Sequence, residues 1–201
     1  MNKSRFLIFL FLASFMAVFQ GRGVYAQNLY PGDVFEVKAV IGSHAIGDAG
    51  GALQDKLYGL DLTYQTGVSH LSDRWVKLSG AQTAGVSVVY RDLQYLKGHR
   101  DTSINSFGQA LGIVANLDFR LLKTSRATFS LRPAIGLSYL TKTFFSDNKN
   151  RFIGSHINEI LKTDLLIQLP VSPSIELTAG AGFLHYSNGG YKIPNSGINM
   201  L

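Results

Sequence analysis

Apolar and polar residues alternate along most of the chain after its N-terminal region. In the clearest segment, residues 111–121, every second residue is apolar, and Asn116, Asp118 and Arg120 lie between them. A period of two predicts β-strands, because successive side chains of a strand point to opposite faces. No segment has a convincing helical period. The predicted strands lie around residues 35–41, 58–64, 86–91, 111–121, 129–139, 157–169 and 175–183.

The alternation leaves open which face of the sheet meets water. A soluble barrel turns its apolar face inward, whereas a membrane barrel turns it outward and lines its interior with polar and small residues. Strands of about ten residues match the length that a tilted strand needs to cross a bilayer. No later apolar run is long enough for a transmembrane helix, so a membrane-embedded form must be a closed barrel. A lipocalin-like barrel has the same period, so alternation alone does not decide.

The number of strands sets a second expectation. Bacterial single-chain barrels have an even number of strands, with a minimum of eight. The eighth strand would have to begin just after Gly197, and the sequence given ends at Leu201. We therefore expect a barrel domain over residues 27–201 that is C-terminally truncated and lacks its closing strand. The alternative is a strand overlooked around residues 74–78.

The lengths of the links predict an orientation. Short links at 122–126 and 170–173 alternate with long ones at 92–109 and 141–156. Short turns of such barrels face the periplasm and long loops face outside, so the last predicted strand ends on the extracellular side. The stretch 67–84 breaks this pattern, because it is long where a short turn is expected.

The N-terminus has the features of a secretory signal peptide. Lys3 and Arg5 precede an apolar run over residues 6–19, and Ala26 closes a stretch suited to cleavage. Removal of residues 1–26, which contain three basic and no acidic residues, lowers the formal net charge from +6 to +3. That charge is too weak to indicate nucleic-acid binding. The chain has no cysteine, which excludes disulfides, thiol chemistry and Cys-based metal sites.

A histidine and a serine lie two residues apart at the end of the last alternating segment, as His185 and Ser187. Residues i and i+2 of a strand share a face about 6.6 Å apart, so the imidazole can reach towards the hydroxyl as its general base. The following Asn-Gly-Gly is also ordinary turn chemistry. Both residues share the odd parity of the apolar residues in 175–183, which points them outward in a membrane barrel. A bulge at Tyr186 would reverse this orientation.

The sequence around this pair resembles a known family. His185-Tyr186-Ser187-Asn188, Gly190 and the Pro-Asn-x-Gly of residues 194–197 together are similar to the signature of PagL-type lipid A 3-O-deacylases. The resemblance also appears in 154–158 and 177–183, and weaker likeness runs from about Phe107 onward. The resemblance implies an all-β fold, an antiparallel eight-stranded outer-membrane β-barrel, reached through a cleaved signal peptide. It implies a serine esterase that hydrolyses an ester-linked acyl chain of lipid A, the lipid anchor of lipopolysaccharide, in the outer leaflet.

The resemblance also assigns roles to residues. Ser187 would be the nucleophile and His185 its base, and the region of Asn188, Gly190 and Asn195 would supply the donors for the oxyanion. No cofactor and no metal are implied. The family has a glutamate two residues after the glycine of Pro-Asn-x-Gly, and this chain has Asn199 there. An asparagine carbonyl can accept a hydrogen bond from the imidazole but cannot stabilise an imidazolium by charge.

We therefore consider Glu159 as the source of the missing charge. If strands 157–169 and 175–183 form a hairpin around 170–173, Glu159 lies opposite His185, or opposite Phe183 and diagonal to His185, on the outward face. The alternative is a solvated glutamate at the rim of the barrel.

Two other functions stay open at this point. One is a non-catalytic outer-membrane barrel that binds lipid or a partner, and the other is a lipid A acyltransferase that uses the same Ser/His chemistry in reverse. The sequence carries no signal for an oligomeric state. The remaining histidines show no ligand spacing and predict no metal site; they are His44, His70, His99 and His156.

Overall fold

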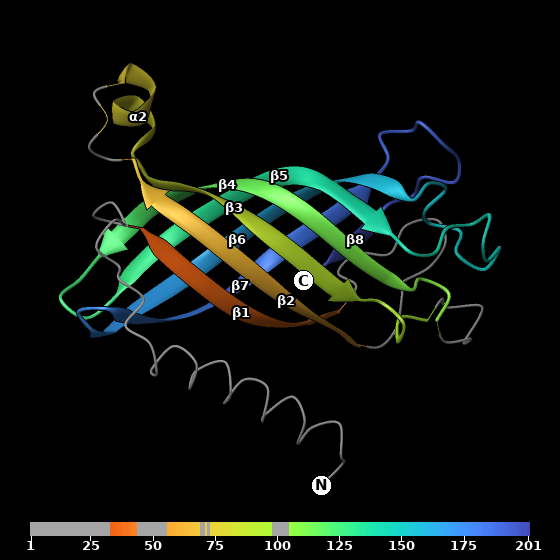
Figure 1. Ribbon diagram of the computed structural model, residues 1–201, viewed down its shortest axis with the longest axis horizontal. Coiled ribbons are helices and arrows are strands. Elements are labelled where there is room, and N and C mark those ends of the chain that lie inside the picture. Colours follow the sequence, from red (N-terminus) through yellow and green to blue (C-terminus); the bar gives the residue numbers. More distant parts are fainter. Residues whose placement is uncertain (1–32, 44–55, 69–70, 72, 98–104) are drawn as a thin grey trace, which may run out of the picture. The chain divides into compact units, whose positions relative to one another are not determined.

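The computed structural model describes residues 33–43, 56–68, 71, 73–97 and 105–201. The predicted signal peptide lies outside these residues. Within them, eight strands form one antiparallel sheet in which each strand pairs with the next along the chain, and the sheet curls into a barrel (Figure 1). The strands are β1 (Val34–Ser43), β2 (Lys56–Gly67), β3 (Ala81–Asp92), β4 (Gln109–Lys123), β5 (Thr128–Leu140), β6 (Ile157–Ser172), β7 (Ile175–Ser187) and β8 (Ile198–Met200).

The seven predicted strands are confirmed as β1 to β7. The prediction that the eighth strand is lacking is wrong, because a short β8 begins directly after Gly197. β8 has three residues and pairs with Leu184, His185 and Tyr186 of β7. The following residue, Leu201, exchanges two backbone hydrogen bonds with Ser43 at the end of β1, at 2.9 and 3.0 Å. The last residues of the chain thus join β7 to β1 at the end of the barrel that carries the long loops.

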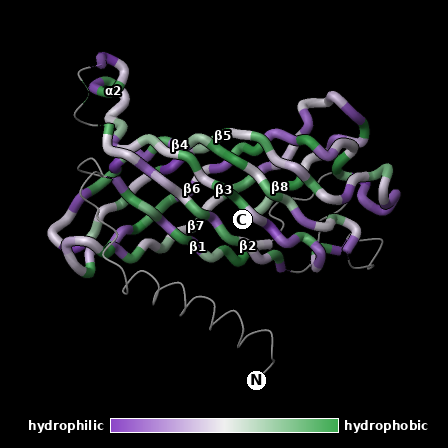
Figure 2. Tube along the Cα trace, viewed as in Figure 1, coloured by the Kyte–Doolittle hydropathy of each residue, from purple (hydrophilic) through white to green (hydrophobic). Residues whose placement is uncertain are grey.

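The two faces of the wall differ in the way that a membrane barrel requires. Hydrophobic and hydrophilic residues alternate along the strands (Figure 2). Large apolar side chains such as Phe35, Ile113 and Ile135 are exposed on the outside, whereas Asp61 and Arg132 are buried inside. An apolar exterior with a polar lumen is the arrangement of outer-membrane barrels, so the structure decides the question that alternation left open.

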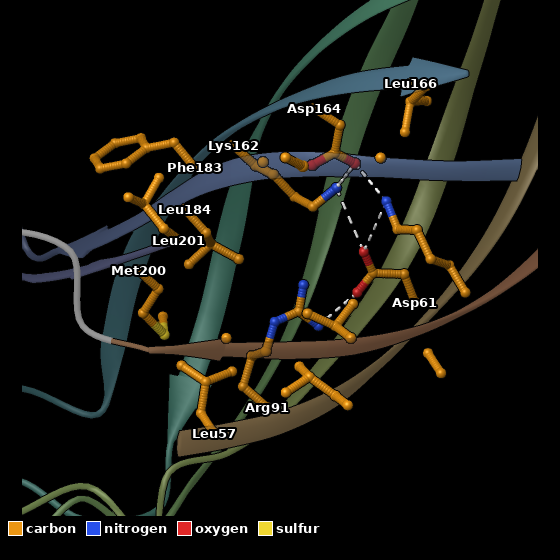
Figure 3. A pocket seen from close by; sticks show the side chains of 18 residues that line it. Leu57, Asp61, Arg91, Lys162, Asp164, Leu166, Phe183, Leu184, Met200 and Leu201 are labelled. Atoms are coloured by element: carbon orange, nitrogen blue, oxygen red, sulfur yellow. Dashed lines mark hydrogen bonds and ion pairs between the residues drawn. The ribbon is translucent and has the colours of Figure 1, made fainter. Parts of the chain in front are cut away.

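Ion pairs fill the middle of the lumen. Asp164 pairs with both Lys38 and Lys162, and Asp61 pairs with Arg91 at 2.5 Å. These five residues line a cavity of about 380 Å³ bounded by β1 on one side and β7 on the other (Figure 3). A buried charge is tolerated where a partner of opposite sign lies beside it. A second group joins Arg132 to Glu36 at 2.7 Å, to Asp118 at 2.9 Å and to Gln65 at 3.1 Å.

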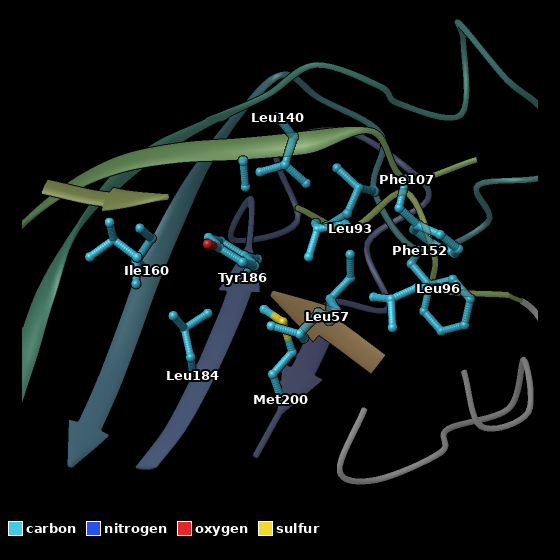
Figure 4. Close-up of a cluster of buried hydrophobic side chains, with 14 of the residues drawn as sticks. Leu57, Leu93, Leu96, Phe107, Leu140, Phe152, Ile160, Leu184, Tyr186 and Met200 are labelled. Atoms are coloured by element: carbon cyan, nitrogen blue, oxygen red, sulfur yellow. The ribbon is translucent and has the colours of Figure 1, made fainter. Parts of the chain in front are cut away.

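The interior becomes apolar towards the loop end (Figure 4). Tyr186 and Ile160 are fully buried there, beside residues from the loops that follow β3 and β5. This apolar interior lies behind the beginning of β6, the end of β7 and the short β8. Its members include Leu57, Leu93, Leu96, Phe107, Leu140, Phe152, Ile160, Leu184, Tyr186, Ile198 and Met200.

The turn between β6 and β7 lies further along the chain than the sequence predicted. β6 continues past Pro170 to Ser172, Pro173 and Ser174 form the turn, and β7 begins at Ile175. A register irregularity lies between Pro170 and Ser172. Glu159 therefore pairs with Ser187. The prediction that Glu159 faces His185 or Phe183 is wrong, because the turn lies later in the chain than predicted and moves the register.

The long link between β2 and β3 contains a helix where the sequence indicated none. α2 (Arg74–Ser79) occupies the position at which a strand might have been overlooked. Six residues are less than two helical turns, too few to show a 3.6-residue period. Among the residues described, no helix is long and apolar enough to cross a membrane.

Candidate active site

The segment after Ser187 is a turn organised by the buried side chain of Asn188. Its Oδ1 accepts a hydrogen bond from the backbone N–H of Gly190 at 3.0 Å, and its Nδ2 donates to the carbonyl of Lys192 at 2.7 Å. Its backbone carbonyl accepts from the N–H of Tyr191 at 3.1 Å. Gly190 has a positive φ of 80°, which the turn requires and glycine adopts without strain. The loop that follows the serine is therefore fixed locally.

A second set of contacts docks this loop onto the segment before β6. Ile153 forms an isolated β-bridge with Asn195. The N–H groups of Ser196 and Gly197 both donate to the carbonyl of Phe152, at 3.0 and 3.3 Å. These bonds hold Asn195 beside Ser187 and Gly197 beside His185. These contacts with the segment before β6 explain how the ten-residue loop 188–197 returns the chain to pair with β7.

His185 and Ser187 point out of the barrel. The pairing of β6 with β7 is regular from Ser187 down to Leu177, so no bulge interrupts the alternation at Tyr186. Tyr186 points inward and is 0% exposed, whereas His185 and Ser187 are half-buried on the outer face. Asn199 pairs with His185 across β7 and β8 and lies on the same face. The outward orientation agrees with the prediction from parity.

Asn199 orients the imidazole. The Nδ1 of His185 lies 2.6 Å from Oδ1 of Asn199. An amide oxygen is an acceptor, so Nδ1 carries the proton and donates, and Nε2 is left as the basic nitrogen of the neutral ring. This is the tautomer that a general base needs to accept a proton from a hydroxyl.

The hydroxyl of Ser187 is held by two other groups. The Nδ2 of Asn195 donates to Ser187 Oγ at 3.1 Å, and the Oδ1 of the same amide lies 3.3 Å from it. The backbone N–H of Gly189 donates to Oγ at 3.2 Å. Within the described part of the chain, no hydrogen bond joins Ser187 to His185. Catalytic hydrogen bonds are often long in the absence of substrate and shorten when it binds.

Of the three predicted oxyanion donors, the structure brings one to the hydroxyl. Asn195 presents Nδ2 to Ser187 Oγ, but the N–H of Asn188 donates to Asn195 Oδ1 at 3.0 Å and that of Gly190 donates within the turn. The N–H of Gly189 reaches the hydroxyl in place of those of Asn188 and Gly190, and it was not among the predicted donors. The Gly-Gly pair was the available signal, since a turn of two glycines exposes backbone N–H groups.

Gly197 is a second residue whose role was not foreseen. Its φ is 70°, and a Cβ at this position would lie 2.6 Å from Cε1 of His185 and 2.9 Å from the carbonyl oxygen of Tyr186. Only a residue without a side chain lets the backbone pass so close to the imidazole. The ring is thus fixed by Asn199 at Nδ1 and by the backbone of Gly197 at its other edge.

Glu159 lies on the outer face across from Ser187. One of its carboxylate oxygens is 3.6 Å from the position that a Cβ on Gly189 would occupy. The carboxylate thus lies on the serine side of the site, diagonal to His185. The described residues contain no hydrogen bond between Glu159 and His185.

The structure describes one of the four remaining histidines. His156 stacks on Tyr139 with ring centroids 5.2 Å apart, and its Nδ1 lies 2.7 Å from the carbonyl of Leu140. His44, His70 and His99 lie outside the described residues. Over the ranges that are described, no three His, Asp or Glu side chains gather in a way that could hold a metal ion.

Residues 49–201 match the family model described as lipid A 3-O-deacylase (PagL). The chain belongs to the lipid A 3-O-deacylase (PagL) family. No curated protein matches it in sequence. Its structure is similar to one described as the crystal structure of the outer membrane enzyme PagL, with a TM-score of 0.53 and 20% identity, over 84% of this chain and 93% of that one. At this identity the likeness shows a PagL-type barrel fold, and roles for individual residues must come from the site itself.

Proposed function

We propose that this protein is an outer-membrane serine esterase that hydrolyses an ester-linked acyl chain of lipid A. The observation that carries the proposal is the contact between Asn199 and His185 on the outer face of the wall, beside Ser187. A hydroxyl, a base in the right tautomer and an orienting acceptor share the surface that faces lipid in a barrel of this family. The substrate of a lipid A deacylase lies in the membrane next to that surface.

The chemistry divides into two steps. Ser187 Oγ attacks the ester carbonyl while His185 Nε2 takes its proton, and the resulting imidazolium gives that proton to the leaving sugar oxygen. Water then attacks the acyl-enzyme, with His185 as base, and releases the fatty acid and the free serine. The products are a fatty acid and a lipid A molecule with one free hydroxyl. No metal or cofactor takes part in this proposal.

The oxyanion of each tetrahedral intermediate needs donors fixed in advance. Asn195 Nδ2 and the N–H of Gly189 lie within 3.2 Å of Ser187 Oγ and are the nearest candidates. Asn188 and Gly190 contribute by holding the turn that presents these donors.

The charge on the imidazolium is the point at which this site departs from its family. Asn199 fixes the tautomer but brings no negative charge. We retain Glu159 as the proposed source of that charge. It would act over a diagonal distance and not through a hydrogen bond, so its contribution should be smaller than that of a carboxylate at position 199.

Several further features belong to the same proposal. The short turns would face the periplasm and the long loops the outside, which places Ser187 in the leaflet that holds lipopolysaccharide. Export would use a signal peptide cleaved after residue 26.

Mass spectrometry of lipid A tests this function. Outer membranes carrying the wild-type protein should lose one hydroxyacyl chain from lipid A, and those carrying Ser187→Ala should not. Ser196→Ala is the matched control, because it makes the same chemical change at an exposed serine in the same loop. Heat-modifiable migration would show that each variant folds. A gain of one acyl chain would instead identify an acyltransferase, and unchanged lipid A would identify a non-catalytic barrel that binds lipid or a partner.

A further inference from the structure

A short helix projects from the end of the barrel opposite to the site. α2 begins after Asp73 and is capped by Gly80, which has a φ of 71° and donates its N–H to the carbonyl of Val76 at 3.0 Å. It forms part of the link between β2 and β3, at the end that also has the two short turns. In Figure 1 the helix projects sideways from the strands.

The helix packs on the outside of the barrel. Val76 is 3% exposed and clusters with Val68 and Ala81, against Ala84 and Phe119. By parity, Ala84 belongs to the outward row of β3 and Phe119 to that of β4, the rows that expose large apolar side chains to lipid. Those two strands pair directly with each other. α2 is therefore attached to the lipid-facing surface and not to the mouth of the lumen.

The rest of the helix is divided into an apolar and a basic side. Each residue of an α-helix advances by about 100°, so residues three apart lie on the same side. Trp75 and Leu78 form one such pair, and they are 50% and 77% exposed. Arg74 and Lys77 form the other pair and are also exposed. The two pairs lie on opposite flanks of Val76 around the helix, so the side that packs on the wall separates an apolar flank from a basic one.

We propose that α2 lies in the interface of the phospholipid leaflet at the short-turn end of the barrel. Trp75 and Leu78 would enter the boundary between head groups and acyl chains, while Arg74 and Lys77 would contact lipid phosphates. Two observations favour lipid as the occupant. Val76 packs against Ala84 and Phe119 of the outward rows, which holds the exposed apolar flank beside the lipid-facing wall, and the basic flank complements anionic phosphates. Tryptophan and basic residues are the groups that anchor helices at such interfaces.

This proposal rests on the fold and not on the esterase activity, so the two fail independently. Trp75 is the only tryptophan of the chain, which makes intrinsic fluorescence a report on α2 alone. The full protein is reconstituted in vesicles of phosphatidylethanolamine and phosphatidylglycerol. Quenching is then measured with acrylamide in the water and with phospholipids brominated at different depths.

We expect emission at shorter wavelength than for tryptophan in water, weak quenching by acrylamide, and strong quenching by bromine. An interfacial helix buries its apolar face about 5–10 Å into the boundary region, so shallow bromine should quench more than deep bromine. Emission like that of free tryptophan, with no quenching by brominated lipid, would overturn the proposal. So would shielding that appears only after a periplasmic extract is added, since α2 would then bind a protein.

A variant separates insertion from simple proximity. Leu78→Asp places a charge on the apolar side, and it should shift the emission to longer wavelength and reduce quenching by brominated lipid. Val171→Asp is the matched control, because it makes a similar change at an exposed residue near the turn between β6 and β7, at the same end of the barrel. It should leave the fluorescence of Trp75 unchanged. If both variants change it equally, insertion of α2 is not what the signal reports.

Discussion

The wall formed by β6, β7 and β8 has two halves of opposite polarity. In the half near the short turns, Leu165 and Ala181 are exposed on the outside and Asp164 lies in the ion pairs of the lumen. In the half near the loops, Tyr186 is buried among apolar residues inside, and Ser187 lies on the outside with Asn195. The strands and their alternation are continuous from one half to the other.

The comparison shows that alternation fixes where a side chain points but not what chemistry it presents. A polar group on the lipid-facing wall costs free energy, so a cluster of them needs a reason. Here the cluster holds a hydroxyl, an imidazole with a defined tautomer and an orienting amide. The half near the short turns carries buried ion pairs that stabilise the barrel, and the half near the loops carries polar groups on its outer face, where we propose that lipid A binds.

The largest effect on activity should come from a substitution on the outer face of the half near the loops. His185→Ala removes the only proposed base, and loss of one member of a coupled Ser-His pair costs on the order of 10⁶-fold in rate. Lipid A deacylation, followed by mass spectrometry, should become undetectable, while heat-modifiable migration stays as in the wild type. A variant that keeps substantial activity would separate the histidine from the chemistry.

A substitution on the inner face of the half near the short turns should reduce stability and leave the activity of the folded protein unchanged. Asp164→Ala leaves Lys38 and Lys162 with Asp61 as their shared partner, at 3.6 and 3.4 Å, and Asp61 already pairs with Arg91. Removing one partner from a buried charge group costs up to about 3–5 kcal/mol. Urea unfolding in detergent should show this loss. The fraction that folds should retain its specific activity, and a fall in activity per folded molecule would contradict the division between the halves.

Gly197→Ala should disturb the imidazole. The added Cβ would meet Cε1 of His185 at 2.6 Å, so the ring must move. A displacement of about 1 Å at a catalytic group can cost 10²-fold in rate. The rate of deacylation should fall by about that factor.

Gly80→Ala is the control for backbone strain in this experiment. Gly80 has nearly the same φ, and a Cβ there would meet nothing within 4 Å. It should reduce stability by about 1–2 kcal/mol and leave the rate unchanged. An equal loss of rate in both variants would show that strain alone is responsible.

Much of this could be read from the sequence, and the exceptions have local causes. Parity placed His185 and Ser187 outward, and the spacing to Asn199 matched the family's orienting residue, because both depend on short-range regularity. The position of Glu159 was missed because the turn lies at Pro173 and Ser174, later in the chain than predicted, which shifts the register. The contacts of Asn195 and Gly189 with Ser187 depend on docking against Phe152 and Ile153, which no local pattern encodes.

Asn199→Asp should increase activity. The carboxylate has almost the same shape as the amide, keeps the contact with Nδ1 and adds a charge that stabilises the imidazolium. A charge-assisted hydrogen bond is stronger by about 1.4 kcal/mol, which corresponds to roughly tenfold in rate.

Glu159→Gln, alone and combined with Asn199→Asp, tests the proposed source of charge. If Glu159 supplies it, the single variant loses activity and the loss shrinks in the Asn199→Asp background. If Glu159→Gln is as active as the wild type while Asn199→Ala is dead, the asparagine alone orients the histidine and the role of Glu159 is wrong.

The smallest effect is expected from a substitution at Tyr186, which lies between His185 and Ser187 in the sequence. Tyr186 points into the apolar interior, and among the described residues its hydroxyl has no hydrogen-bond partner. Tyr186→Phe should raise stability by up to about 1 kcal/mol, or leave it unchanged, and should not alter the rate. A loss of activity at this inward position would weaken the contrast between the two faces.

The central claim is that Ser187 is a nucleophile presented to the membrane. The most direct test is covalent labelling with a fluorophosphonate that carries a long alkyl chain, in vesicles that contain the folded protein. Peptide mass spectrometry should find the label on Ser187, and labelling should be lost in His185→Ala and kept in Tyr186→Phe. Label on another serine, or equal labelling of wild type and His185→Ala, would contradict the account.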